Sequence, residues 1–356
     1  MIQFEHVSKS YGKTPVLKDL NFTIPDGQFV VLIGPSGCGK TTTMKMINRL
    51  LEPDSGTIRI DGQDIHSQDK VELRRHIGYV IQQIGLFPNM TVAQNICVVP
   101  KLLKYDKARC DEIVQEMLQL VHMEQSANKY PSELSGGQQQ RIALARAIVV
   151  NPKVMLLDEP LSNLDPQLRE TMRFEIKKLQ KEFGFTIIFV THDQSEAMAL
   201  SDRMLVMDMG NIQQTGTPLE LYNNPKNRFV HSFLGQSNFT HVKIKGGKAY
   251  CQGDSSRVVW EAPAGTKDGE MLMATRPNTI DINRSEGFCT KIIKRVFRTD
   301  FVEYLVQVGD DVLRVQTPHR NLFSEGEECF LRFPSPMWYP AQEEGADEER
   351  AKRMIV

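Results

Sequence analysis

The segment GPSGCGKT, residues 34–41, constrains the fold of this chain more than any other stretch. It matches the phosphate-loop pattern G-x-x-x-x-G-K-S/T and stands between the apolar run FVVLIG (29–34) and the helical pattern TTTMKMINRLL (41–51). Glycines let the backbone wrap tightly, so that successive N–H groups and the N-terminus of the next helix point at one anion. The segment therefore predicts a strand, a phosphate-binding loop and a helix, in which Lys40 reaches the β- and γ-phosphates and the Thr41 hydroxyl binds Mg²⁺.

Two further apolar runs, KVMLLD (153–158) and TIIFVT (186–191), are short, unbroken and bounded by polar or turn residues. Runs of this form are typical of strands that are buried on both faces of a parallel sheet, where helices cover the sheet. Helical patterns separate these runs along the first part of the chain. We therefore expect an α/β domain over residues 1–235.

The sequence pattern changes after Gly235. FVEYLVQV (301–308) alternates apolar and polar residues, the following Gly-Asp-Asp breaks the alternation, and VLRVQ (312–316) resumes it. This is the pattern of a β-hairpin. At 356 residues the chain is long enough for a second core, so we expect a small all-β domain at 236–340 and a charged tail at 341–356.

Composition excludes several classes of protein. The formal net charge of −1 gives no reason to expect nucleic acid as the main partner. No apolar run reaches the roughly 18 residues that a membrane span needs, and MIQFEHVSKSYG has no signal-peptide pattern. The six cysteines are scattered, which predicts reduced thiols rather than disulfides or a zinc site.

Polar residues follow the two later strand candidates. Asp158 and Glu159 stand side by side at the end of the run 153–158, and His192 follows the run 186–191. Open α/β sheets bind ligands at the carboxyl ends of their strands. Asp158 suits the Mg²⁺ shell, Glu159 suits a general base or an orienting group for the attacking water, and His192 can hydrogen-bond the γ-phosphate.

Two more candidates admit two interpretations each. Gln82 follows the strand candidate IGYVI, and a neutral amide can contact the metal or the water, but the adjacent Gln83 fits the spacing equally well. The ring of Tyr11 can stack on adenine or pack against its own strand. The residues alone leave both questions open.

A second glycine pair occurs in LSGGQQQR, residues 134–141. Ser135 is a good N-cap and QQQRIALARAI is a plausible helix, so this is a second helix start that suits an anion. Because the phosphate loop already wraps one side of a triphosphate, the second surface is useful if it closes on the other side. The sequence does not say whether it closes within one chain or from a second copy.

The order of these motifs resembles that of the ATP-binding cassette (ABC) ATPases over residues 1–235. The resemblance implies a P-loop NTPase cassette with a helical subdomain at about 88–150, ATP and Mg²⁺ as cofactors, and two cassettes that pair head to tail. It implies nucleotide contacts for Tyr11, Val16, Gly34, Ser36, Gly37, Cys38, Gly39, Lys40, Thr41, Thr42 and Gln82, metal contacts for Thr41, Gln82 and Asp158, and catalysis by Glu159 and His192. Ser135, Gly136, Gly137 and Gln138 would contact the partner's ATP, and Ser162 to Asp165 would pass between the two sites.

The resemblance also implies a biological role. ATRPNTIDI (274–282) is similar to an element of the OB-like (TOBE) regulatory domain of importer ATPases, and the cassette looks closest to those of glycine betaine and choline importers. Polyamine, iron(III), sulfate and sugar importers remain alternatives, and a soluble non-transport ABC ATPase is a more remote one. The implied partners are a second copy, a membrane permease that docks at GLFPNMTV (85–92) and, indirectly, a solute-binding protein. The implied location is peripheral, on the cytoplasmic face of the membrane. Because Cys38 lies in the phosphate loop, we also expect alkylation of its thiol to block ATP binding and ATP to protect it.

Overall fold

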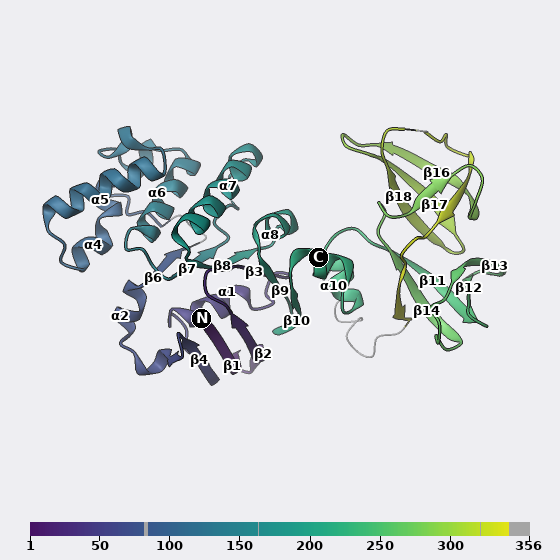
Figure 1. The fold of residues 1–356 in the computed structure, drawn as a ribbon, viewed down its shortest axis with the longest axis horizontal. Coiled ribbons are helices and arrows are strands. Elements are labelled where there is room, and N and C mark those ends of the chain that lie inside the picture. Colours follow the sequence, from purple (N-terminus) through teal and green to yellow (C-terminus); the bar gives the residue numbers. More distant parts are fainter. Residues whose placement is uncertain (82–84, 163, 321, 342–356) are drawn as a thin grey trace. The chain divides into compact units, whose positions relative to one another are not determined.

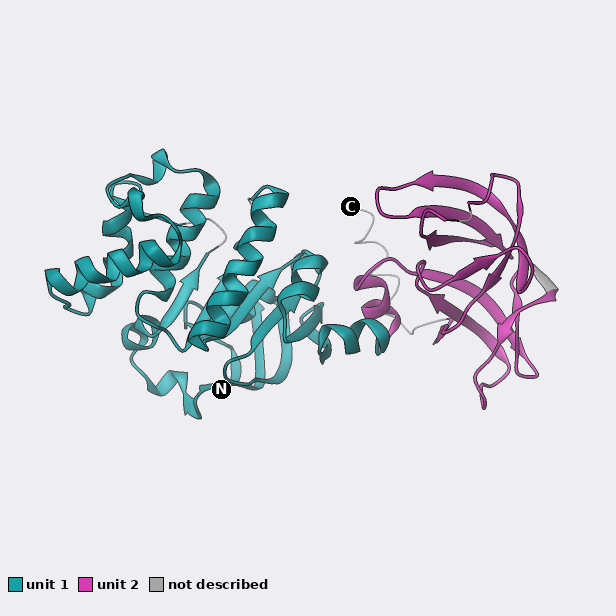
Figure 2. Cartoon of the chain, turned by 45° about the horizontal axis from the view of Figure 1, so that its top comes forward, with its two compact units in different colours: residues 1–226 teal, residues 227–356 magenta. Residues whose placement is uncertain are grey.

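The chain divides into two units, residues 1–226 and residues 227–356, which Figure 2 shows in different colours. The computed structural model describes residues 1–81, 85–162, 164–320 and 322–341. The boundary expected at residue 235 lies just after helix α10 (Arg228–Phe233), which belongs to the second unit. None of the described helices is long and apolar enough to cross a membrane.

A six-stranded sheet forms the centre of the first unit, in the order β10-β9-β3-β8-β7-β6. All neighbouring strands are parallel except β10, which is antiparallel to β9. The strands are β3 (Phe29–Ile33), β6 (Ile77–Val80), β7 (Val154–Asp158), β8 (Thr186–Thr191), β9 (Arg203–Asp208) and β10 (Asn211–Gly216). Every residue of β3, β7 and β8 is buried, as their unbroken apolar runs predict, and the α/β fold class is confirmed.

A second, antiparallel sheet lies on the other side of this unit from α7 and α8 (Figure 1). Its strands are β1 (Ile2–Tyr11), β2 (Thr14–Ile24), β4 (Ser55–Ile60) and β5 (Gln63–Asp64), in the order β2-β1-β4-β5. The rings of Phe4 and Phe22 stack at 4.4 Å between centroids. One apolar core joins this sheet to helix α1 and to the parallel sheet. The apolar runs and motifs of the sequence did not predict this sheet.

The helices of the first unit occupy two regions. They are α1 (Lys40–Ile47), α2 (Lys70–Arg75), α3 (Val92–Ile96), α4 (Val98–Leu102), α5 (Lys107–Leu120), α6 (Gly136–Ile148), α7 (Pro166–Phe183), α8 (Gln194–Leu200) and α9 (Pro218–Asn223). Helices α3 to α6 share a separate apolar core around Ile96, Ile113 and Ile142. Figure 1 shows α4, α5 and α6 gathered at one end of the unit. This core therefore builds a helical subdomain beside the sheet.

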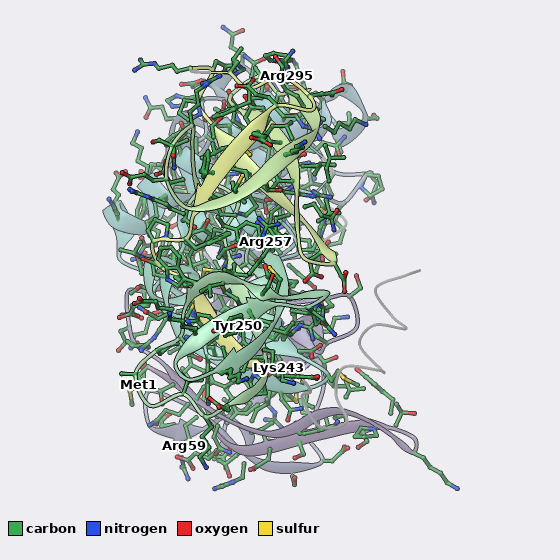
Figure 3. All side chains as sticks on the ribbon, turned by 90° about the vertical axis from the view of Figure 1, so that its right-hand side faces the viewer. Met1, Arg59, Lys243, Tyr250, Arg257 and Arg295 are labelled. Atoms are coloured by element: carbon green, nitrogen blue, oxygen red, sulfur yellow. The ribbon has the colours of Figure 1, made fainter. Side chains whose placement is uncertain are left out.

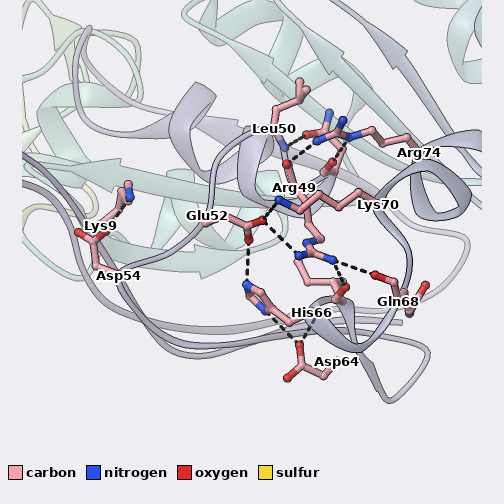
Figure 4. Close-up of polar contacts among 12 residues, drawn as sticks. Lys9, Arg49, Leu50, Glu52, Asp54, Asp64, His66, Gln68, Lys70 and Arg74 are labelled. Carbon is pink, nitrogen blue, oxygen red and sulfur yellow. Dashed lines mark hydrogen bonds and ion pairs between the residues drawn. The ribbon is translucent and has the colours of Figure 1, made fainter.

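A polar network fixes the chain just after α1 (Figure 4). The Arg49 guanidinium donates to the carbonyl oxygens of Ile65 (3.0 Å) and Gln68 (2.9 Å). The Glu52 carboxylate pairs with Lys70 at 2.7 Å and with His66 at 2.9 Å. The hydrogen bond from Lys70, with one from Arg49, lowers the pKa of Glu52 to about 2. The network therefore ties the end of the phosphate-loop helix to the segment that precedes α2.

The described residues of the second unit are all-β apart from α10, as their alternating sequence predicts. Its two sheets have the orders β13-β12-β11-β14-β20 and β15-β19-β16-β17-β18. The strands are β11 (Asn238–Lys245), β12 (Lys248–Cys251), β13 (Asp254–Glu261), β14 (Gly269–Thr275), β15 (Asp281–Asn283), β16 (Phe288–Phe297), β17 (Val302–Val308), β18 (Asp311–Thr317), β19 (Glu328–Arg332) and β20 (Met337–Pro340). Lys243 and Tyr250, which Figure 3 labels, face each other across β11 and β12. The predicted hairpin is confirmed, because β17 and β18 pair antiparallel from Val308–Asp311 onward.

Arg276, in the ATRPN motif, holds the chain segment that follows α10. Its buried guanidinium donates to the carbonyl oxygens of His231 (2.7 Å) and Gly235 (3.2 Å) and to the Ser237 hydroxyl (2.7 Å). The carbonyls at a helix C-terminus lack partners within the helix and attract a cation. The motif therefore closes the end of α10 onto the β structure of its own unit.

Candidate functional site

The phosphate loop joins β3 to α1, and its glycines are required by the space around them. Gly37 and Gly39 have φ angles of 77° and 108°, which residues with a side chain rarely adopt. A Cβ atom on Gly39 would lie 2.3 Å from the Leu17 side chain, and one on Gly34 would lie 2.1 Å from the Met207 carbonyl oxygen. The loop therefore takes this tight path only with glycine at these positions.

Two backbone carbonyls hold the Lys40 side chain inside the loop. Its ammonium donates to the carbonyl oxygens of Gly34 (2.8 Å) and Pro35 (2.9 Å), and the side chain is 7% exposed. Both of these partners are neutral, so these two contacts leave the positive charge of the ammonium uncompensated. The arrangement therefore presents a cation, together with the N-terminus of α1, to an anionic ligand.

A cavity of about 410 Å³ opens over this loop. Its lining consists of Tyr11, Val16, Ser36, Gly37, Gly39, Lys40, Thr41, Thr42 and Glu159. The structure thus brings together, from four separate parts of the first unit, residues that the sequence analysis assigned to the nucleotide and to catalysis. Tyr11 is half exposed at the end of β1, so its ring is available to a ligand rather than packed in the core.

Thr41 and Asp158 are the described residues that could hold a metal ion at this cavity. The Thr41 hydroxyl donates to the Asp158 carboxylate over 3.0 Å. Burial raises the pKa of Asp158, and the hydrogen bond from Thr41 opposes that rise. A hydroxyl and a carboxylate are the hard oxygen donors that Mg²⁺ prefers, and Mg²⁺ commonly keeps waters and substrate phosphates as its other ligands. Gln82, the third predicted ligand, lies outside the described residues, as does Gln83.

Glu159 has a strained backbone at the end of β7. Its φ is 46°, an uncommon value for a residue with a side chain. Its N–H donates to the Val190 carbonyl at 3.0 Å, and its own carbonyl accepts from the Ser162 hydroxyl at 3.0 Å. The Glu159 carboxylate lies 3.3 Å from Nδ1 of His192. The structure thus places the two predicted catalytic side chains against each other, with Glu159 in the cavity wall and the His192 ring mostly exposed.

Two groups that the sequence analysis missed support this arrangement. The buried carboxylate of Glu196 accepts from the Thr191 hydroxyl at 2.6 Å, and that hydroxyl accepts from the N–H of Asp193 at 3.0 Å. Gly210, in the turn between β9 and β10, donates its N–H to the Cys38 carbonyl at 3.2 Å. The φ angle of Gly210 is 81°, a value typical of a glycine in a turn, and the sequence could have suggested such a turn. The sequence could not have suggested the contact of Gly210 with the phosphate loop, because that contact depends on the strand order.

The LSGGQ segment begins α6, and the predicted N-cap is confirmed. The Ser135 hydroxyl accepts from the Gln138 N–H, and the Gln138 side chain accepts from the Ser135 N–H at 3.0 Å. A Cβ atom on Gly137 would lie 1.9 Å from the Leu168 side chain, whereas one on Gly136 would meet no atom within 4 Å. In the part of the chain that the structure describes, the cavity over the phosphate loop is not lined by any residue of the segment 134–138. Ser135 and Gly136 therefore present an open helix start that is separate from that cavity.

The loop that leads from Glu159 to α7 contains the predicted inter-site residues. Ser162 bonds back to the Glu159 carbonyl, and the Asp165 carboxylate caps α7 by accepting from the Leu168 N–H at 3.0 Å. Asn163 lies outside the described residues. The loop is thus anchored at both ends, to the catalytic strand and to the start of α7.

The structure contradicts the expected alkylation of Cys38. Cys38 is 3% exposed, its sulfur lies 3.8 Å from the Lys40 ammonium, and burial raises the pKa of the thiol. A buried protonated thiol reacts slowly, because the thiolate is the nucleophile. Only the backbone of Cys38 remains a candidate for nucleotide contact.

We therefore expect iodoacetamide to label Cys38 of the folded protein slowly, and more slowly than Cys289, the most exposed of the six cysteines. Unfolding in guanidinium should bring both to the same rate, because the environments are then equal. Mass spectrometry of peptides after timed labelling measures this directly. Fast labelling of Cys38 in the native protein, suppressed by ATP, would restore the original expectation.

Comparison with known proteins shows the family to which the chain belongs. Residues 17–162 match the ABC transporter family. The choline transport ATP-binding protein OpuBA of Bacillus subtilis is 44% identical over 313 residues, which are 87% of this chain and 76% of that protein. The glycine betaine/carnitine/choline transport ATP-binding protein OpuCA of the same organism is 53% identical over 66% of this chain, and the match spans 63% of that protein, less than two thirds of its length.

Two further comparisons cover different parts of the chain. The spermidine/putrescine import ATP-binding protein PotA of Pseudomonas fluorescens is 41% identical over 93% of this chain and 94% of that protein. The dimeric structure of a post-hydrolysis state of the ATP-binding cassette MJ0796, bound to ADP and Pi, superposes with a TM-score of 0.56 and 34% identity, covering 61% of this chain and 99% of that one. With the phosphate loop, the acidic strand end and the LSGGQ helix start in place, the chain belongs to the ABC transporter family, as one of its ATP-hydrolysing subunits.

Proposed function

We propose that this chain is the energy-coupling ATPase of an importer for a small quaternary amine such as choline, carnitine or glycine betaine. The support for this solute class is the identity of 53% to OpuCA and 44% to OpuBA, whose names state these solutes. A polyamine is the main alternative, because the PotA match, at 41% identity, extends over nearly the whole chain. Iron(III), sulfate and sugar importers remain further alternatives, and a soluble ABC ATPase without a transport partner is the most remote.

The described residues would divide the chemistry of ATP hydrolysis among them. Lys40, the loop N–H groups and the N-terminus of α1 would bind the phosphates, and the exposed ring of Tyr11, with Val16, would contact the adenine. Thr41 and Asp158 would hold Mg²⁺, which supplies positive charge to the β- and γ-phosphate oxygens when bound.

The water that attacks the γ-phosphate would be oriented by Glu159, which lines the cavity and can accept a proton. In the described structure His192 contacts the Glu159 carboxylate. We infer that His192 turns to the γ-phosphate when ATP is bound, because its mostly exposed ring is free to move. The contact between His192 and Glu159 would then break when the γ-phosphate is present and form again when it has left.

The observation that carries the cooperative part of this proposal is the separation of two anion-binding surfaces. The phosphate loop lines one cavity, and the exposed helix start at Ser135–Gly136 lies outside that cavity. In a head-to-tail pair of identical chains, each helix start would face the γ-phosphate bound by the other chain, and the loop 162–165 would lie between the two sites. The cassette MJ0796 was solved as a dimer, which supports the same arrangement here.

The segment 85–92 is the proposed docking surface for a permease, which would place the chain peripherally on the cytoplasmic face of the membrane. The buried amide of Asn95 bonds to the N–H and carbonyl of Phe87 and to the carbonyl of Met90, at 2.8–3.1 Å. Arg146 of α6 donates to the Gly85 carbonyl at 2.9 Å and stacks over the Phe87 ring. The Phe87 side chain is nevertheless 43% exposed. The loop is thus held in place, exposes an aromatic ring and contacts the helix that begins at LSGGQ. These features suit contact with a partner protein that responds to ATP binding.

Reconstitution of the complete transporter tests the solute. The tagged chain is purified from its own membrane with the associated permease, placed in proteoliposomes with its solute-binding protein, and supplied with labelled choline, carnitine, glycine betaine or spermidine. We expect ATP-dependent uptake of a quaternary amine and none in a complex that carries Glu159→Gln. Uptake of spermidine alone would favour the polyamine alternative, and purification without any membrane protein would favour the soluble one.

A further inference from the structure

Arg169, in the first turn of α7, contacts two loops that flank the reaction centre. Its Nη2 donates to the carbonyl of Leu164 at 3.0 Å. Its Nη1 lies 3.6 Å from the Asp193 carboxylate, and its Nε lies 3.7 Å from the Glu196 carboxylate. One side chain therefore spans from the inter-site loop to the start of α8, and none of these three partners lines the nucleotide cavity of the described structure.

On one side, Arg169 holds the loop that follows the catalytic carboxylate. Leu164 is the penultimate residue of this loop, and its N–H donates to the Leu161 carbonyl at 3.2 Å. Ser162, in the same loop, bonds to the carbonyl of Glu159. A shift of the loop would therefore displace the groups that contact both the Glu159 backbone and the Arg169 guanidinium.

On the other side, Arg169 holds two residues of the network around the switch histidine. Glu196 is buried and accepts from Thr191, and Asp193 donates its N–H to the same Thr191 hydroxyl. His192 lies between Thr191 and Asp193, so the direction of its backbone is set by this cluster. Arg173 also acts on the Glu196 carboxylate from α7, so loss of Arg169 would leave the Asp193 and Glu196 carboxylates with weaker compensation of their mutual repulsion in a partly buried site.

We propose that Arg169 is a positioning residue for ATP hydrolysis, which couples the position of the inter-site loop to that of His192. A planar guanidinium with five N–H donors can bond a carbonyl and two carboxylates at once, whereas an ammonium acts as a single point charge. Movement of the inter-site loop when two chains meet would thus be transmitted to the histidine of the same chain. The inference rests on the proposed roles of residues 162–165 and His192.

The test compares Arg169→Met and Arg169→Lys with Arg109→Met, a control on the exposed face of α5. Arg109 is a suitable match because it also pairs with two carboxylates, those of Glu112 (3.0 Å) and Glu116 (3.6 Å), far from any residue of the site in sequence. We expect Arg169→Met to lower kcat for ATP about tenfold with KM for ATP within about twofold. Arg169→Lys should recover part of the loss, and Arg109→Met should hydrolyse ATP as the wild type does.

A double-mutant cycle separates positioning from general damage. If Arg169 acts through Glu196, Arg169→Met combined with Glu196→Gln should fall little below the slower single variant. Additive losses, a rise in KM equal to the fall in kcat, or unchanged kcat in Arg169→Met would overturn the proposal. If the Met variant does not fold, the Lys variant and its cycle with Glu196→Gln give the same decision. Failure of the proposed function gives a different result, since Glu159→Gln would then keep its turnover while Arg169→Met could still lose activity.

Discussion

Replacing Glu159 with glutamine is expected to lower ATP turnover by about 10²–10⁴-fold while ATP still binds. Glutamine has the same shape but cannot accept a proton from the attacking water at neutral pH. The contacts that hold the strained backbone of Glu159 use its N–H and carbonyl, to Val190 and Ser162, and these survive the change. The cavity and the phosphate loop should therefore remain intact, so the substitution should slow the hydrolysis step and not weaken the binding of ATP.

The same variant should accumulate as an ATP-bound dimer. Because hydrolysis reopens the proposed pair of chains, a chain that binds ATP without cleaving it stays closed. Size-exclusion chromatography with light scattering, with and without Mg-ATP, measures this, and bound nucleotide is quantified in the dimer peak. Lys40→Ala, which removes the cation inside the loop, is the control that should stay monomeric. A Glu159→Gln protein that remains monomeric at saturating ATP would count against the closed pair, and wild-type turnover would count against Glu159 as the base.

The parts of the site that a short segment encodes could be predicted from the sequence. The segment GPSGCGKT determines the conformation of its own loop, because the glycines, the lysine and the start of the following helix are adjacent in the sequence. The acidic pair at 158–159 and the N-cap at Ser135 are local features of the same kind. Periodicity and capping residues alone place each of them at the end of an element, because strand ends and helix starts follow from adjacent residues.

Contacts between distant segments could not be predicted in this way. Gly210 touches the phosphate loop because β9 lies next to β3, and His192 meets Glu159 because β8 lies next to β7. Strand order is not written in the periodicity of any one strand. Arg169 was missed for the same reason, since its role depends on the packing of α7 against α8, and in sequence it looks like an ordinary surface arginine.

The direction of a side chain in a loop also could not be predicted from the sequence, because a loop has no periodicity. Cys38 lies in the middle of the phosphate loop, which suggested a thiol beside the nucleotide. Because Gly39 bends the backbone, the thiol instead faces the space next to Gly34, where it is buried. In the second unit the alternation of residues 301–308 did predict the buried face of Val302, Tyr304, Val306 and Val308, because a strand has a regular two-residue repeat, although Glu303 is buried as well.

Mixing two inactive variants is expected to restore ATP hydrolysis. Lys40→Ala removes the cation that binds the phosphates, and Gly136→Arg places a large side chain on the exposed helix start, where a Cβ atom meets no neighbour within 4 Å. The second change should therefore leave the fold intact, unlike a change at Gly137, whose Cβ would collide with Leu168. If each ATP is bound by the loop of one chain and the helix start of the other, both variants are inactive alone.

In a mixed dimer, the chain with Gly136→Arg still has Lys40, and the chain with Lys40→Ala still has Gly136. These two unaltered surfaces face each other at one of the two sites, so an equal mixture should contain roughly a quarter of the wild-type number of intact sites. Phosphate release from the mixture, compared with each variant alone, measures the rescue. A chain that carries both changes supplies the control, because it brings no Lys40 and cannot rescue Lys40→Ala. If the mixture stays inactive at concentrations where the wild type hydrolyses ATP, the two anion-binding surfaces do not meet across a pair of chains.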